Sequence, residues 1–154
     1  MESNNFMLKN GWIPFYENQK EYWYQTKSSR LEIKPISSKR KSELKKLKIS
    51  NNTHNNEIQK PIEFEQYDFG VFEDFFFDDI FWGRIHFFDN QVLYSIMNQT
   101  DSKKSYGTLS YYYLLDRFLG KFEYLYITDF FEQFSYKQNL PGFEYWNGKE
   151  WVKK

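Results

Sequence analysis

The sequence contains no cysteine, no alanine, only two histidines and no long run of apolar residues. Without cysteine, the chain cannot form disulfides or metal sites with thiolate ligands. His54 and His86 are too few for a metal site built from several histidines, so we expect no bound metal. No apolar stretch approaches the roughly 18 residues that span a bilayer, so we expect no membrane partner.

The formal net charge is zero, with 21 basic and 21 acidic residues, so the whole molecule has no overall attraction to nucleic acids or membranes. The segment Met1–Asn5 lacks the charged and apolar regions of a signal peptide, so we expect a cytoplasmic protein. Heavy use of Phe, Tyr, Lys, Asn and Ile without alanine indicates an AT-rich genome.

Aromatic residues make up 23% of the chain, although its mean hydropathy is low at −0.81. Disordered chains are poor in aromatic residues, so we expect this chain to fold. A length of 154 residues predicts a single domain, residues 1–154, with a sizeable core.

The central stretch of the chain predicts a β-hairpin followed by a helix and a third strand. Trp82–Phe88 and Gln91–Met97 flank the turn Asp89-Asn90. From Tyr106 to Leu119 apolar residues recur at helical spacing, and Phe122–Ile127 is rich in strand-forming residues. A right-handed crossover then places Phe122–Ile127 parallel to Gln91–Met97, with the helix over one face of the sheet.

The start of this helix is a candidate site for an anion, because backbone N–H groups at a helix N-terminus point outward. The candidate binding residues are Lys103, Lys104, Ser105, Gly107 and Thr108. The alternative is an ordinary capped helix preceded by two solvated lysines.

A strongly basic segment occurs in the N-terminal half. A helix is predicted from Ser37 or Ser38 to Lys48, and residues 30–48 contain eight basic and two acidic residues. We identify its residues Lys39, Arg40, Lys41, Lys45 and Lys46 as candidates for contacts with nucleic-acid phosphates. The alternatives are a solvated face, or a face that meets the acidic residues of segment 63–79.

The remaining segments give shorter predictions. Glu21–Tyr24 and Ser29–Ile33 are expected to form a hairpin, and Phe143–Trp146 another with Glu150–Val152 around Asn147-Gly148. The remaining predictions are a polar loop near 49–60, an edge strand at Ile62–Glu65, and helices over Tyr67–Phe77 and Asp129–Lys137.

The strand–loop–helix–strand order resembles the central motif of the GNAT-fold acyltransferases. Tyr124-Leu-Tyr-Ile127 followed by Tyr136-Lys137 resembles the "YLYLG…YK" stretch of aminoacyl-tRNA–protein transferases. Leu8–Trp12, Ser29–Ile33 and Ser37–Lys46 are weaker matches to the arginyl-transferases. The chain departs from these families in having no cysteine cluster, one loop glycine instead of two, and Thr128 in place of a motif glycine.

The resemblance implies an α+β fold, with a GNAT-like mixed sheet flanked by helices. It implies an N-acyltransferase or aminoacyl-tRNA–protein transferase-like enzyme that moves an acyl or aminoacyl group to a peptide or small amine. The donor would be acyl-CoA or aminoacyl-tRNA, with tRNA as a partner and no tightly bound cofactor. Tyr126, Tyr136 and Lys137 fall on the family motif, and Glu132 is a candidate general base. The alternative is a non-catalytic GNAT-like binding or structural subunit.

Overall fold

The structure, a computed structural model, describes residues 4–17, 20–25, 28–54, 71–88, 90–96, 105–127 and 139–153. Within these ranges the helices are α1 (Asn4–Lys9), α2 (Ser38–Lys45) and α3 (Tyr106–Arg117). The strands are β1 (Trp12–Glu17), β2 (Lys20–Gln25), β3 (Ser29–Glu32), β4 (Ile49–His54), β5 (Val71–Phe77), β6 (Ile80–Phe88), β7 (Gln91–Ile96), β8 (Tyr124–Ile127), β9 (Phe143–Trp146) and β10 (Trp151–Lys153).

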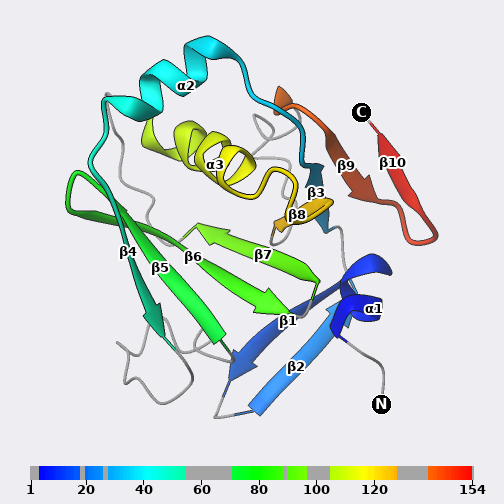
Figure 1. The fold of residues 1–154 in the computed structure, drawn as a ribbon. Helices are drawn as coiled ribbons and strands as arrows, with labels where there is room; N and C mark the ends of the chain where they lie inside the picture. Colours follow the sequence, from blue (N-terminus) through cyan, green and yellow to red (C-terminus); the bar gives the residue numbers. More distant parts are fainter. Residues whose placement is uncertain are drawn as a thin grey trace.

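Eight of these strands form one mixed sheet, in the order β10-β9-β3-β8-β7-β6-β5-β4 (Figure 1). The pairing of β7 with β8 is parallel, and every other pairing in this sheet is antiparallel. The prediction that the 91–97 and 122–127 strands lie side by side in parallel, joined through the 106–119 helix, is therefore confirmed. The described residues form an α+β fold.

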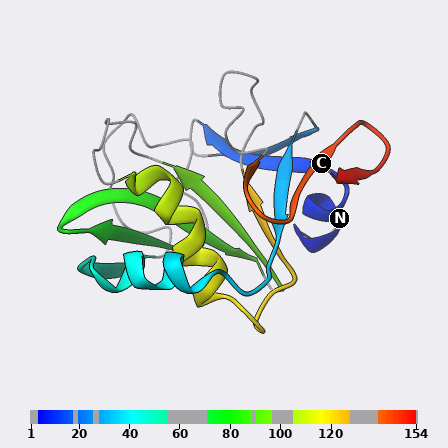
Figure 2. The same cartoon turned by 90° about the horizontal axis from the view of Figure 1, so that it is seen from above.

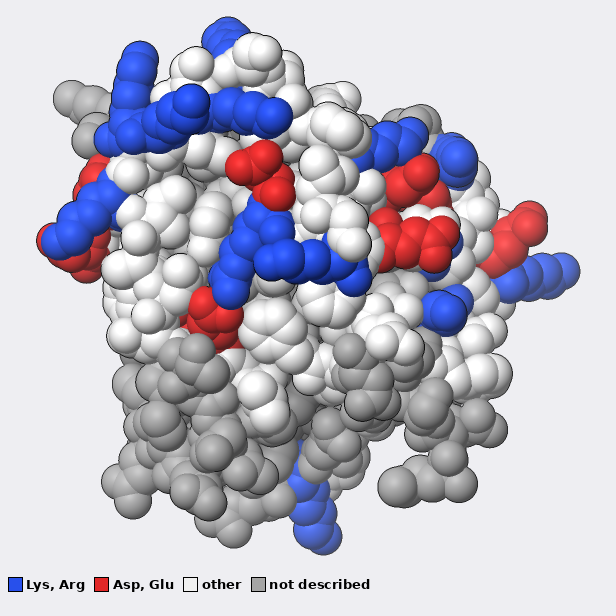
Figure 3. Space-filling model, viewed as in Figure 1, with Lys and Arg blue, Asp and Glu red and all other residues white. Residues whose placement is uncertain are grey.

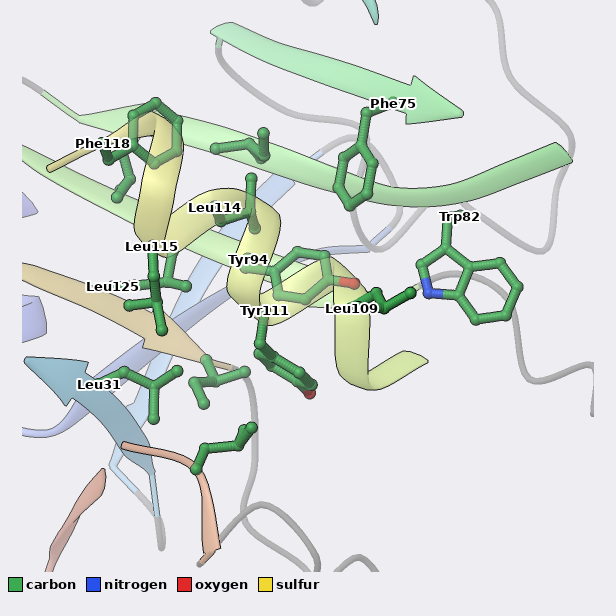
Figure 4. Packing of buried hydrophobic residues seen from close by; sticks show 14 of the residues in the cluster. Leu31, Phe75, Trp82, Tyr94, Leu109, Tyr111, Leu114, Leu115, Phe118 and Leu125 are labelled. Carbon is green, nitrogen blue, oxygen red and sulfur yellow. The ribbon is translucent and has the colours of Figure 1, made fainter. Parts of the chain in front are cut away.

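The two faces of the sheet carry separate hydrophobic clusters. One face packs against α3, whose Leu109, Leu114 and Leu115 meet apolar side chains from β5 to β8 (Figure 4). In Figure 2 α3 runs beside α2, which lies next to it over the sheet. The opposite face carries a smaller cluster, in which Leu8 and Ile13 contact residues of β6, β7 and β8.

The N-terminal hairpin forms with a different partner from the one predicted. β2 pairs with β1 in a separate two-stranded sheet, whereas β3 inserts between β8 and β9 of the large sheet. The predicted pairing of Glu21–Tyr24 with Ser29–Ile33 is thus wrong. Period-2 alternation marks strands but does not choose their partners, and β3 finds more buried contacts at the centre of the large sheet.

The predicted helix over Tyr67–Phe77 is also wrong, because Val71–Phe77 is strand β5. Its Phe75 and Phe77 pack into the α3-side cluster, while the residues between them face the other side of the sheet. A strand buried on both faces shows no clean alternation, so its phenylalanines can also match helical spacing.

The predicted polar loop near 49–60 begins instead with strand β4, which pairs with β5 and lies last in the order of the sheet. Its polar residues suit an edge strand, since one side of such a strand has no partner strand. The other local predictions agree better with the structure. Ser37 caps α2 by accepting from the N–H of Arg40, and β9 and β10 form the hairpin around Asn147-Gly148. The segments Ile62–Glu65 and Asp129–Lys137 lie outside the described residues.

Candidate functional site

The first turn of α3 follows β7, beside the parallel β7·β8 pair, and contains three of the predicted binding residues. Ser105 occupies the N-cap position in the left-handed conformation, with φ 56° and ψ 41°, and its side chain makes no capping hydrogen bond. Gly107 and Thr108 lie in the first turn. Lys103 and Lys104 lie outside the described residues. The turn therefore exposes backbone donors that its own N-cap side chain leaves unoccupied.

The start of α3 is held in place by the turn between β5 and β6. Asp78 and Asp79 have φ values of 51° and 67°, as in a two-residue hairpin turn that needs positive φ at both positions. The Tyr106 hydroxyl donates to the Asp78 carboxylate. The backbone N–H of Lys48 donates to the same carboxylate at 3.0 Å. Sequence reasoning missed this anchor, which fixes the first residue of α3.

A second connection joins the sheet to the first turn of α3. The Tyr94 hydroxyl, from β7, donates to Ser110 Oγ at 2.6 Å, and Ser110 Oγ donates to the Gly107 carbonyl at 2.7 Å. Tyr94 has room for its ring because Gly83 faces it from β6. A Cβ at that position would lie 2.5 Å from the ring. The position of the first turn thus depends on side chains inside the core.

The candidate catalytic residue Tyr126 lies in the smaller cluster, fully buried on β8. Its hydroxyl accepts a hydrogen bond from Arg30 Nη1 at 3.2 Å, and Arg30 pairs with the buried Glu144 at 2.8 Å. The Arg30 guanidinium also lies 3.6 Å from the ring centre of Tyr124 and 4.2 Å from that of Trp151. Burial raises the pKa of the Tyr126 hydroxyl to about 12, although the Arg30 charge acts in the opposite direction. Tyr126 is therefore neutral at physiological pH.

A row of polar side chains crosses the sheet on the face opposite α3. Asp74, Arg84 and Ser95 lie directly across from one another on β5, β6 and β7. Arg84 Nε donates to Asp74 Oδ1 at 2.6 Å, and the guanidinium lies over the Phe72 ring. Ser95 Oγ has no hydrogen-bond partner among the described residues, so no base in those ranges activates it as a nucleophile.

The basic residues of α2 lie on the surface, and Figure 3 shows blue side chains gathered where α2 runs. Lys39, Lys41, Lys45 and Lys46 are exposed and make no ion pair with the described residues. Arg40 is different, because it pairs with Glu43 at 3.3 Å and lies over the Tyr112 ring.

The acidic segment meets basic residues only in part through the region of α2. Lys48, just beyond the helix, pairs with Asp79 at 2.9 Å. Glu73 instead pairs with Arg117 of α3, and Asp74 with Arg84 of the neighbouring strand. Described acidic side chains therefore leave the four exposed α2 lysines without a counter-charge.

Three candidate catalytic residues, Glu132, Tyr136 and Lys137, lie outside the described residues. Within the described ranges no group of three His, Cys, Asp or Glu side chains is arranged to hold a metal ion. None of the described helices has the length and apolar character needed to cross a membrane. No protein-family model matches this chain, and no curated protein matches it.

Proposed function

We propose that the chain is an N-acyltransferase or an aminoacyl-tRNA–protein transferase-like enzyme, with a GNAT-like sheet. The observation that carries the proposal is the uncapped first turn of α3, which follows β7 next to its parallel partner β8. Backbone donors at a helix start favour an anionic group, and the proposed donors, acyl-CoA and aminoacyl-tRNA, both carry phosphates. The acceptor would be a peptide N-terminus or a small amine.

The proposed reaction needs no covalent enzyme intermediate. The lone pair of the amine forms a C–N bond to the acyl carbonyl carbon, and the C–S or C–O bond to the donor breaks. A base takes the ammonium proton, and the leaving thiolate or alkoxide takes a proton. Glu132 remains the proposed base, with Tyr136 and Lys137 beside the leaving group. The high pKa of Tyr126 suits it to a neutral hydrogen-bonding role and not to a base.

Replacing Gly107 tests whether a donor binds at the first turn of α3. Wild-type protein should be stabilised by CoA, acetyl-CoA or aminoacyl-tRNA, by about 2.7 kcal/mol when the ligand is present at 100 times its Kd. Gly107→Val should abolish this shift in a thermal-melting experiment, because the branched side chain occupies the space beside the backbone donors. Gly107→Ala is the matched control for folding.

The unliganded variants separate this effect from misfolding. Gly107 has a negative φ, and a Cβ there would meet only the Trp82 ring, at 3.8 Å. Alanine should therefore stabilise the free protein by up to about 1 kcal/mol, and valine should leave it folded. Equal ligand-induced shifts in wild type and Gly107→Val would contradict the site.

The exposed lysines of α2 favour tRNA as the donor, because CoA needs only the helix start. Replacing Lys39, Lys41, Lys45 and Lys46 by alanine should weaken tRNA binding and flatten its salt dependence, by roughly 0.7–0.9 in slope per lost phosphate contact. Filter binding at several salt concentrations measures both quantities.

Two controls define the surface. Arg40→Ala should change the slope little, because Glu43 already neutralises Arg40. Lys149→Ala, in the exposed turn between β9 and β10, should also leave the slope unchanged. A flat slope for wild type would exclude a nucleic-acid partner on α2.

The second candidate function is a non-catalytic GNAT-like binding or structural subunit. The full burial of Tyr126 favours it, since the residue on the family motif is occupied by Arg30 inside the core. This candidate predicts that wild type melts at the same temperature with and without CoA, acetyl-CoA and aminoacyl-tRNA.

A further inference from the structure

Trp82, at the start of the central hairpin, lies against the first turn of α3. Its side chain is 3% exposed, and its ring makes an edge contact with Tyr106 at 5.4 Å between centres. The nearest atom to a Cβ built on Gly107 is Cζ2 of the Trp82 ring. In Figure 4 the ring nitrogen lies on the side that faces α3. The ring therefore forms one wall of the helix start.

The indole Nε1 of Trp82 has no hydrogen-bond partner among the described residues. An N–H group that is buried without an acceptor destabilises a protein, whereas a phenylalanine at the same position would carry no such group. Ser105 leaves the backbone donors of the same turn without a side-chain cap. Unoccupied donors of two kinds, indole and backbone, thus occur side by side.

We infer that Trp82 is a ligand-binding residue whose indole N–H donates, together with the first-turn backbone N–H groups, to an anionic oxygen. The ligand chemistry is a phosphate or diphosphate oxygen, because several converging donors suit an acceptor with more than one lone pair and a negative charge. This inference rests on the proposed function for the identity of the donor, CoA or aminoacyl-tRNA. The anion site itself does not require that function.

The matched control is Trp146 on β9, which is also buried and also has an unpartnered Nε1. It packs against Trp151 and not against α3. Trp82→Phe and Trp146→Phe therefore remove the same ring and the same kind of N–H at two places. Trp82→Phe should lower the affinity for CoA or aminoacyl-tRNA about tenfold in calorimetry, while Trp146→Phe leaves it unchanged.

A measurement on wild type keeps the test valid if a variant does not fold. In ¹⁵N-labelled protein the indole N–H resonance of Trp82 should move downfield as inorganic pyrophosphate is added, because the proton acquires an acceptor. The Trp146 resonance should stay fixed. Parallel titrations with CoA and with tRNA show which phosphate source moves the Trp82 signal.

The outcomes separate the two ideas. If wild type binds CoA or aminoacyl-tRNA but the Trp82 resonance stays fixed and Trp82→Phe binds equally well, the inference fails and the proposed function stands. If pyrophosphate moves the Trp82 resonance while neither donor binds, the anion site stands and the proposed function fails. If no probe moves the resonance, the inference is overturned.

Discussion

Replacing Arg30 by methionine should lower the free energy of unfolding by about 3–5 kcal/mol. Arg30 and Glu144 are both buried, at 8% and 3% exposure, so the substitution leaves a carboxylate inside the protein without its cation. It also removes the guanidinium from between the Tyr124 and Trp151 rings. Urea denaturation at neutral pH measures the change.

Two further variants show that the loss comes from the uncompensated charge. Arg30→Met combined with Glu144→Leu removes both charges and should recover most of the stability, since a buried ion pair is often no better than apolar packing. Lys34→Met breaks the exposed pair with Glu32, at 3.5 Å, and should cost less than about 1 kcal/mol. A double variant as unstable as Arg30→Met would contradict this account.

The arrangement around Arg30 shows what the sequence can and cannot predict. The start of α2 at Ser37, helix α3 and the 91–96 strand follow from residues a few positions apart, and these predictions are confirmed. The partners of Arg30 lie 96 and 114 residues away in the chain. Alternation within Ser29–Glu32 predicts a strand but carries no information about which strands flank it.

The candidate site divides in the same way. Ser105, Gly107 and Thr108 were identified from the helix start, and the structure places them in its first turn. Trp82 was not identified, because the lack of a partner for an indole N–H is a property of packing and leaves no sequence signal. Asp78 was missed for a related reason: its importance comes from a positive φ and from bonds to Lys48 and Tyr106.

Raising the pH should destabilise the fold through Tyr126. Its pKa is about 12 in the folded protein and about 10 in the unfolded chain, where it is exposed to solvent. Between these values the unfolded chain loses the proton and the folded protein keeps it. The stabilisation is therefore fully present below about pH 10 and declines as the pH rises toward 12, by about 2–3 kcal/mol in total.

Comparison of wild type with Tyr126→Phe isolates this effect from the other tyrosines and lysines that titrate in the same range. Near pH 8 the variant should be less stable by about 1 kcal/mol or more, because Arg30 loses the acceptor for Nη1. Between pH 9 and 11.5, urea denaturation should show the stability of wild type falling more steeply than that of the variant, so that the two curves converge. Arg30 keeps its charge throughout this range, so its pair with Glu144 is common to both proteins. Parallel curves would mean that the Tyr126 hydroxyl is not held in its neutral form by burial.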